Sequence, residues 1–141
     1  MERFYGEKTA QIRDASGRSP ADYFELLLKI WSADTCAPRM RSDWKPENPT
    51  LGQCSVTAFL MQDRFGGEVK GITLEDGSIH CFNSVDGALF DLTSAQFGDR
   101  TLAYGEAKEQ SRDIHFAKEE KRLRYESLRK ALAEALGTEE R

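Results

Sequence analysis

Apolar residues recur at helical spacing soon after residue 18. They share one face of a helix, and they are Tyr23, Leu26, Leu27, Ile30 and Trp31. Ser19 suits the N-cap and Pro20 the first helical position, and Asp22 lies in the first turn near the positive end of the helix dipole. The pattern predicts a core helix from about residue 20. Residues 1–18 show no clear period, so we expect a polar N-terminal arm, either loosely held or forming a small added element.

A second helix is predicted from about residue 52 to residue 65, where apolar residues lie on several faces. This distribution is typical of a central helix packed on more than one side. Gly66 and Gly67 follow it, and glycine readily adopts the left-handed conformation that ends a helix. Residues 36–52 contain three of the four prolines. They predict a long loop that forms either a wall of a site or irregular packing around Trp44.

Strand-like patterns follow between residues 68 and 97. The stretches 68–77, 78–85 and 88–97 are separated by turn signals, and Asp86 with Gly87 is a strong hairpin signal. They predict a small antiparallel meander of about three strands. From Gly105 onward the pattern predicts a continuous or broken helix to the end of the chain. We expect its leucine stripe to pack on the domain, and a homodimer through this C-terminal helix is the alternative.

Composition narrows the class of protein. The chain has 141 residues, 39% hydrophobic and 31% charged, which suits a single α+β domain over residues 19–141 behind the arm of residues 1–18. The net charge of −4 disfavours a nucleic-acid partner, which usually requires a basic face. No apolar run reaches the ~20 residues of a membrane span, and the polar N-terminus lacks the apolar core of a signal peptide. We therefore expect a cytoplasmic protein that binds neither nucleic acid nor membranes.

The three cysteines, Cys36, Cys54 and Cys81, include no CxxC pair. An odd number without a secretion signal argues against a disulfide framework. A zinc site would have to combine ligands at irregular spacings, so we expect neither a metal nor another cofactor. We interpret Cys36 and Cys81 as structural, and we expect His115, in a charged helical segment, to be exposed.

Cys54 is predicted in the first turn of the central helix, where the helix dipole and free N–H groups favour thiolate over thiol. His80 lies in the first strand of the predicted hairpin. Asp91 lies in the second strand, opposite or diagonal to His80 and within side-chain reach. These residues fit a Cys-His-Asp triad of nucleophile, proton carrier and orienting carboxylate.

Each member of this triad also has a structural interpretation. Cys54 could be a buried residue beneath the sheet, since cysteine is among the most buried residue types. His80 could be a strand histidine bonded to a carbonyl. Asp91 could cap a turn or pair with Arg64 or Arg100.

Four further positions are assigned to the surroundings of the thiol. The backbone N–H groups of Cys54 and Ser55 are placed to form part of an oxyanion hole, with Gln53 as an amide donor. Trp44, in the preceding loop, is a candidate for substrate binding. Asn83 keeps a Cys-His-Asn variant open, although it lies on the opposite face of its strand from the histidine.

Several segments resemble the bacterial YunG-like proteins, an uncharacterised family. The segments are WSADT, TLGQCSVTAFLMQDRFGGEV, GSIHCFNSVDGALFDLTSAQF and RYESLRKAL. The resemblance covers about residue 20 to residue 136, and its specific parts are Gly-Gln-Cys and Asp-Leu-Thr-x-x-Gln-Phe. The family layout is similar to the papain and transglutaminase class, so the resemblance implies a cysteine-proteinase-like core with Cys54, His80 and Asp91 in that order. Relatives favour an aromatic residue after the histidine; here it is Cys81, which we expect to face away from the triad.

The predicted fold is therefore α+β, with a central cysteine-bearing helix packed on a small antiparallel sheet, an N-terminal helix and a long C-terminal helix. The predicted function is thiol-dependent acyl transfer, as in a peptidase, amidase, deamidase or transglutaminase-like enzyme, on a peptide, protein or amide substrate. The alternatives are a non-catalytic binding or regulatory module and a thiol redox sensor. The sequence does not choose among hydrolysis, deamidation and transamidation, because the substrate pocket is assigned to the loop of residues 36–52.

Overall fold

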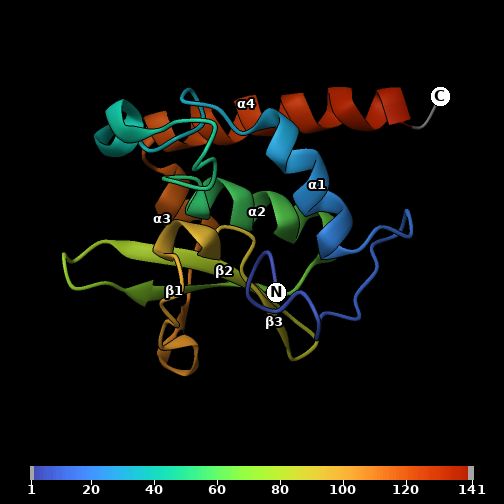
Figure 1. Ribbon diagram of the computed structural model, residues 1–141, viewed down its shortest axis with the longest axis horizontal. Helices are drawn as coiled ribbons and strands as arrows, with labels where there is room; N and C mark the ends of the chain where they lie inside the picture. Colours follow the sequence, from blue (N-terminus) through green and yellow to red (C-terminus); the bar gives the residue numbers. More distant parts are fainter. Residues whose placement is uncertain (1, 140–141) are drawn as a thin grey trace.

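The computed structural model describes residues 2–139 and shows an α+β fold built in layers (Figure 1). An antiparallel sheet forms the first layer. The central helix α2 (Cys54–Phe65) packs across it, and α4 (Glu119–Glu139) packs on the opposite side of α2 together with α1 (Pro20–Ile30). The cysteine-bearing helix thus lies between the sheet and the outer helices, as its apolar faces predict.

Helix α1 begins where the sequence predicts it. The Ser19 hydroxyl accepts a hydrogen bond from the Asp22 backbone N–H at 3.2 Å, and the Asp22 carboxylate accepts one from the Ser19 N–H at 2.9 Å. This capping box satisfies two N–H groups at the helix start. At the other end, the buried indole of Trp31 donates to the Thr57 hydroxyl at 2.9 Å. That bond fixes α1 against α2.

The sheet contains β1 (Glu68–Thr73), β2 (Ile79–Val85), β3 (Ala88–Phe90) and β4 (Lys108–Glu109), in the order β3-β2-β1-β4. The predicted hairpin is confirmed, because Val85 pairs with Ala88 across a two-residue turn. Asp86 and Gly87 both have positive φ, +50° and +83°, as a type I′ turn requires. The third strand is shorter than predicted: it ends at Phe90, and the chain then turns into the 3-10 helix η2 (Ser94–Phe97).

The C-terminal part is less helical than predicted. Residues 104–111 form the 3-10 helix η3 (Tyr104–Glu106) and then β4, which pairs with Lys70 and Gly71 at the edge of β1. Helix α3 (Arg112–Phe116) begins only at the Ser111 cap, and α4 follows after a short break. A pattern rich in charged residues does not distinguish an exposed edge strand from a surface helix, because both are solvated. Leu128, Leu132 and Leu136 are buried in the main core, so the leucine stripe packs on the domain as expected.

Two apolar cores lie on opposite faces of the sheet. The main core joins α1, α2, α4 and the helix-facing side chains of the strands. A smaller core on the other face contains Ile72, Phe82, Leu102 and Tyr104. The segment between η2 and β4 therefore covers the second face of the sheet. None of the helices formed by residues 2–139 combines the length and apolar composition needed to cross a bilayer.

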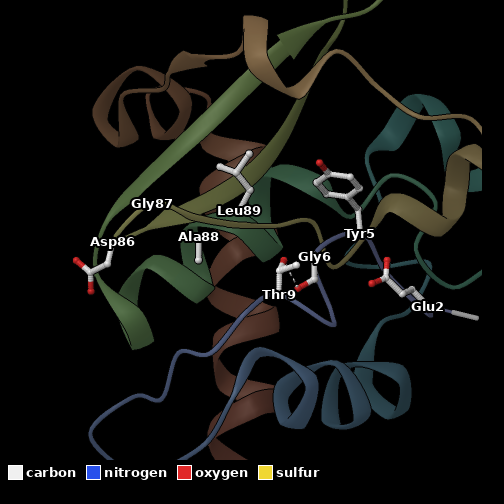
Figure 2. A pocket seen from close by; sticks show the side chains of 8 residues that line it. All are labelled: Glu2, Tyr5, Gly6, Thr9, Asp86, Gly87, Ala88 and Leu89. Atoms are coloured by element: carbon white, nitrogen blue, oxygen red, sulfur yellow. Dashed lines mark hydrogen bonds between the residues drawn. The ribbon is translucent and has the colours of Figure 1, made fainter.

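The N-terminal segment packs on the domain. Phe4 is buried in the main core, and the Tyr5 carbonyl accepts a hydrogen bond from the Asp91 N–H at 3.0 Å. Gly6 lies so close to β3 that a Cβ atom there would overlap the carbonyl of Leu89. A hollow of about 500 Å³ lies between this segment and the β2–β3 turn. Figure 2 shows the residues that line it. Residues 2–9 are thus a structural part of the region around Asp91.

The loop of residues 36–52 is irregular apart from the 3-10 helix η1 (Pro38–Asp43). Ala37 N–H donates to the Gly52 carbonyl at 2.9 Å, which brings the two ends of the loop together. The first residues of the loop therefore lie beside its last residue, at the start of α2.

Candidate active site

Cys54 is the first residue of α2, and the Gln53 side chain does not cap the helix. The first N–H groups of a helix have no partner within it, so the positive end of the α2 dipole lies at this thiol. The preceding turn requires glycine: Gly52 has φ +71°, and a Cβ there would lie 2.5 Å from the sulfur of Cys36. The Gly-Gln-Cys element thus places Cys54 where a thiolate is favoured.

His80 lies near the start of β2, beyond the last residue that β3 covers. Its side chain is only 1% exposed, and the ring of Phe97 packs edge-on against it with centroids 4.7 Å apart. His80 Nε2 lies 2.6 Å from Asp91 Oδ2. The hairpin register extended beyond Phe90 would place Asp91 diagonal to His80, so the predicted cross-strand contact is confirmed.

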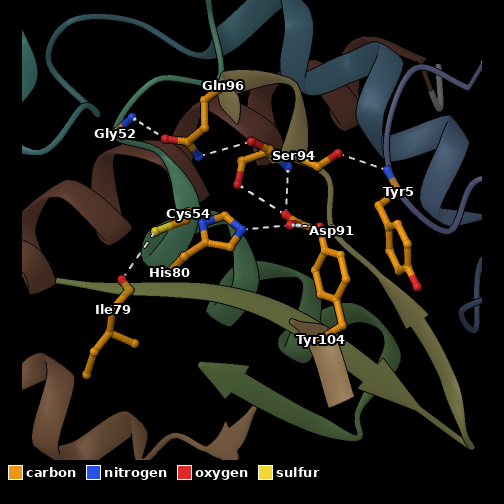
Figure 3. Close-up of polar contacts among 10 residues, drawn as sticks. Tyr5, Gly52, Cys54, Ile79, His80, Asp91, Ser94, Gln96 and Tyr104 are labelled. Atoms are coloured by element: carbon orange, nitrogen blue, oxygen red, sulfur yellow. Dashed lines mark hydrogen bonds and ion pairs between the residues drawn. The ribbon is translucent and has the colours of Figure 1, made fainter. Parts of the chain in front are cut away.

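Asp91 is held by several donors besides the histidine (Figure 3). The Tyr104 hydroxyl donates to Oδ2 at 2.8 Å, and the N–H and hydroxyl of Thr93 lie 3.2 and 3.4 Å from Oδ1. Burial and the adjacent carboxylate raise the pKa of Tyr104, so its hydroxyl keeps its proton and remains a donor. Tyr104 was missed in the sequence because it lies in a segment with no pattern that points to Asp91.

The second ring nitrogen of His80 is directed toward the thiol. Nδ1 is buried and makes no hydrogen bond of standard geometry within the described part of the chain. Figure 3 shows the ring between the Asp91 carboxylate and the Cys54 sulfur, with Nδ1 on the sulfur side. Because the carboxylate accepts the Nε2 proton, neutral His80 presents the Nδ1 lone pair to Cys54. That tautomer can accept a proton from the thiol.

The protonation of the two residues is coupled. A hydrogen bond from the Cys81 thiol and the nearby imidazole of His80 outweigh the effect of burial and hold the pKa of Cys54 well below its ordinary value. Burial opposes the charged form of His80, but the hydrogen bond to Asp91 and the adjacent sulfur outweigh it and raise the pKa of His80 to about 10. Both shifts favour a thiolate beside an imidazolium over a neutral thiol and imidazole.

Cys81 does not face away from the thiol, and that prediction is wrong. Its face of β2 packs on α2: the Asn83 amide, two residues further on, donates to the Ala58 carbonyl at 2.8 Å. Cys54 lies one helical turn before Ala58, with its sulfur 3.9 Å from the carbonyl oxygen of Ile79. Helix and strand thus run side by side and bring the two thiols together. Successive side chains of β2 point to opposite faces of the sheet, so the sequence predicts that Cys81 and His80 point apart. It does not show on which of the two faces α2 packs.

The thiol of Cys54 opens onto a cleft of about 840 Å³. Residues 37–40 and Gly52 line one side of it, which confirms that the long loop forms a wall of the site. Gln96 links η2 to the turn before α2, because its side-chain oxygen accepts a hydrogen bond from the Gly52 N–H at 3.4 Å. Both Gln96 and Phe97 line the cleft. The Asp-Leu-Thr-x-x-Gln-Phe element therefore supplies the carboxylate at its first residue and part of the cleft wall at its last two.

The assignment of Gln53 as an amide donor to the site is wrong. Its buried side chain accepts a hydrogen bond from the Thr35 hydroxyl at 2.8 Å and donates to the Ser32 carbonyl at 3.0 Å. Gln53 thus anchors the loop after α1 instead of facing the cleft. Ser55 does line the cleft, beside Cys54 at the start of α2.

Trp44 and Asn83 also lie outside the site. The Trp44 indole donates to the Pro49 carbonyl at 3.0 Å, and Trp44 is not among the described residues that line the cleft. Asn83 is buried and bonded to α2, so it does not replace Asp91 as the partner of the histidine. Cys36 is fully buried beneath the loop, in accordance with a structural role, and burial raises its pKa.

His115 is buried, so the prediction that it is exposed is wrong. Its ring packs on Phe59, and it bonds to the Gln110 side chain at 3.0 Å and to Lys121 Nζ at 2.9 Å. The break between α3 and α4 turns this side chain inward, which a uniform helical pattern does not show. His115 and Lys121 both line the cleft.

Among the side chains that the structure describes, those of residues 2–137, no group of three or more histidine, cysteine, aspartate or glutamate residues is arranged to hold a metal ion.

Comparison with known proteins gives the family. Residues 19–137 match the family model described as YunG protein. The chain belongs to the YunG family. Uncharacterized protein YunG of Bacillus subtilis (strain 168) is 42% identical over 72 residues, which are 51% of this chain and 57% of that relative. The match thus spans little more than half of the YunG relative, and no solved structure matches the chain.

Proposed function

We propose that this protein is a thiol-dependent acyl-transfer enzyme with a papain-like or transglutaminase-like core. Cys54 is the nucleophile, His80 the proton carrier and Asp91 the residue that orients it. One observation carries the proposal: a thiol at an uncapped helix start faces the free Nδ1 of a histidine whose other nitrogen is 2.6 Å from a buried carboxylate. This arrangement is what a cysteine nucleophile requires.

The reaction follows from these positions. The Cys54 thiolate attacks the carbonyl carbon of an amide, and the developing oxyanion accepts hydrogen bonds from the backbone N–H groups of Cys54 and Ser55. His80 then gives its Nδ1 proton to the leaving nitrogen, the C–N bond breaks, and a thioester remains. Water or an amine then attacks the thioester while Nδ1 removes a proton from it, the C–S bond breaks, and an acid or a new amide leaves. The sulfur departs as a thiolate and His80 keeps the proton, so the thiolate–imidazolium pair is restored. Hydrolysis, deamidation and transamidation share these steps.

The proposal can be tested without a substrate. The rate of Cys54 alkylation by iodoacetamide is measured against pH in the wild type and in His80→Ala, with the modified cysteine identified by mass spectrometry. An unperturbed thiol titrates near 8.5. We expect Cys54 to react well below that pH, and the low-pH reactivity to be lost in His80→Ala. If Cys54 is inert at every pH in the folded protein, the proposal is rejected and the binding-module alternative is favoured.

A second candidate function is a thiol redox sensor, and the contact between Cys54 and Cys81 favours it. The Cys54 thiolate would attack one oxygen of hydrogen peroxide, breaking the O–O bond to give a sulfenic acid and hydroxide. The Cys81 thiol would then attack that sulfur and release water, leaving a disulfide. This function predicts a Cys54–Cys81 linked peptide after mild peroxide treatment, and a persistent sulfenic acid in Cys81→Ser. Sulfenic acid without the linked peptide in the wild type would exclude Cys81 as the resolving thiol.

A further inference from the structure

The cleft beside Cys54 has an excess of positive charge. Five lysine and arginine side chains and three carboxylates line it, although the net charge of the whole chain is −4. Every one of these carboxylates lies beside an arginine. The pairs are Arg124–Glu120 at 2.7 Å, Arg39–Asp76 at 3.7 Å and Arg100–Glu75 at 3.7 Å. The excess charge therefore comes from Lys118 and Lys121, which have no carboxylate at ion-pair distance among the side chains described, those of residues 2–137.

Lys121 is the better placed of the two lysines. It is partly buried, it lies at the start of α4, and its Nζ donates to His115 Nδ1 at 2.9 Å. The Gln110 amide nitrogen donates to the Lys108 carbonyl at 3.1 Å, so its oxygen is the atom that accepts from His115 Nε2 at 3.0 Å. His115 therefore has its proton on Nε2 and offers Nδ1 to Lys121 as a neutral acceptor.

The charge at this position belongs to the lysine alone. Burial and the adjacent ammonium lower the pKa of His115 to about 4, so the imidazole stays neutral at physiological pH. The ammonium uses one of its three donors on His115, and no carboxylate within the described residues neutralises it. Lys121 lines the same cleft as Cys54. Burial lowers the pKa of Lys121, and the nearby sulfurs of Cys81 and Cys54 oppose that shift by favouring the ammonium. A partly buried cation without a counter-ion is a site for an anion.

We infer that Lys121, held by His115, binds a carboxylate of the substrate, so that the acyl substrate is an amide or ester with a carboxylate near its scissile carbonyl. The inference rests on the proposed function, because it concerns the substrate that reaches Cys54. Lys121 is a binding residue in this scheme, and it takes no part in proton transfer.

Two small alkylating reagents separate this inference from the proposed function. Iodoacetate and iodoacetamide react with a thiolate in the same way and have nearly the same size, but only iodoacetate carries a carboxylate. The ratio of their second-order rate constants at Cys54 therefore reports the attraction for an anion, independently of the fraction of thiolate. The imidazolium of His80 also attracts iodoacetate, so the informative quantity is the change in this ratio between variants.

The ratio is measured at pH 7 in the wild type, Lys121→Gln, Lys121→Arg and Lys130→Gln. Lys130 is an exposed residue of α4 outside the cleft, so its replacement controls for net charge. We expect the iodoacetate-to-iodoacetamide ratio to fall about fivefold in Lys121→Gln, as removal of a unit charge a few ångströms from the reagent implies. The ratio should be retained in Lys121→Arg and in Lys130→Gln.

Each outcome has one meaning. An equal ratio in Lys121→Gln and the wild type, with Cys54 still alkylated by iodoacetamide, overturns the carboxylate site and leaves the proposed function intact. An equal fall in Lys130→Gln also overturns it, because net charge would then explain the effect. If neither reagent alkylates Cys54 in the wild type, the proposed function fails and the inference fails with it.

Discussion

Replacement of Asp91 by asparagine tests how the carboxylate controls His80. Asp91→Asn keeps the size of the side chain and removes its charge. The histidine then loses the anion that lies 2.6 Å from its Nε2. We expect the pKa of His80 to fall from about 10 to about 8.

The size of this effect follows from the geometry. The rise in the pKa of His80 from 6.5 to about 10 corresponds to about 5 kcal/mol in favour of the charged ring. Two charges whose centres lie about 4 Å apart interact by about 4 kcal/mol at an effective dielectric constant near 20. The Coulomb value is an upper limit for the loss, because asparagine keeps a carbonyl oxygen that can accept from Nε2. The Cys54 sulfur also supplies part of the total, so we assign about half of the 5 kcal/mol, or about 2 pKa units, to the charge of Asp91.

The sign determines which limb of the titration moves. At low pH His80 is already protonated in both proteins, so Cys54 still loses its proton beside an imidazolium. As the pH rises, the imidazolium of the variant loses its proton at a lower pH than that of the wild type. The upper pH limit of the thiolate–imidazolium pair is therefore lowered. The replacement therefore affects the alkaline limb of the reactivity profile.

The pKa of His80 is measured by NMR titration of the imidazole carbons. The chain has only two histidines, so His80→Ala assigns the signals. Asp86→Asn is the matched control, because Asp86 is exposed in the turn of the same hairpin and its φ of +50° suits asparagine. An unchanged pKa of His80 in Asp91→Asn would refute the electrostatic coupling. An equal fall in Asp86→Asn would show that it arises from net charge.

Three further predictions concern stability. Tyr104→Phe removes the hydrogen bond to the buried carboxylate and should lower the free energy of unfolding in urea by about 1.5–3 kcal/mol; a loss below about 0.5 kcal/mol would contradict its role. Gly52→Ala should lower the free energy of unfolding by more than about 2 kcal/mol, for two reasons. The new Cβ would overlap the sulfur of Cys36, and alanine would have to adopt the positive φ of this position. Gly77→Ala is the matched control, because Gly77 also has positive φ, +87°, but a Cβ there would have no atom within 4 Å. Its loss of stability, about 1 kcal/mol, measures the backbone penalty alone. Asp14, with its pKa lowered to about 2 by hydrogen bonds that outweigh burial, contributes stability that is present above pH ~4 and is lost as the pH falls toward 2. Asp14→Asn should therefore flatten the acid limb of the unfolding free energy by about 1 kcal/mol, and an unchanged limb would exclude this contribution.

The parts of the site that follow from short-range patterns could be predicted from the sequence. The start of α2 at Cys54 follows from the Gly-Gln-Cys turn and the apolar helix after it. The contact of His80 with Asp91 follows from the Asp86-Gly87 turn, because a two-residue hairpin fixes the register of its strands. Both predictions required only neighbouring residues and the geometry of one hairpin.

The parts that depend on tertiary packing could not be predicted in this way. Cys81 lies beside the thiol because α2 packs on one face of β2, and alternation along a strand does not say which face that is. Lys121 and His115 reach the cleft only through the break between α3 and α4 and the packing of α4 on α2. Tyr104 reaches the carboxylate because residues 98–107 cover the second face of the sheet.

The attachment of the N-terminal segment affects how this protein can be expressed and compared. The family match begins at residue 19, whereas the backbone of Tyr5 bonds to Asp91 and Ser94 and Phe4 fills the main core. A recombinant fragment trimmed to the matched region would lose both contacts and expose the back of the aspartate turn to water. An unreactive Cys54 in such a fragment would therefore not count against the proposed function. Assays on this protein should keep the residues before the matched region and place affinity tags at the other terminus.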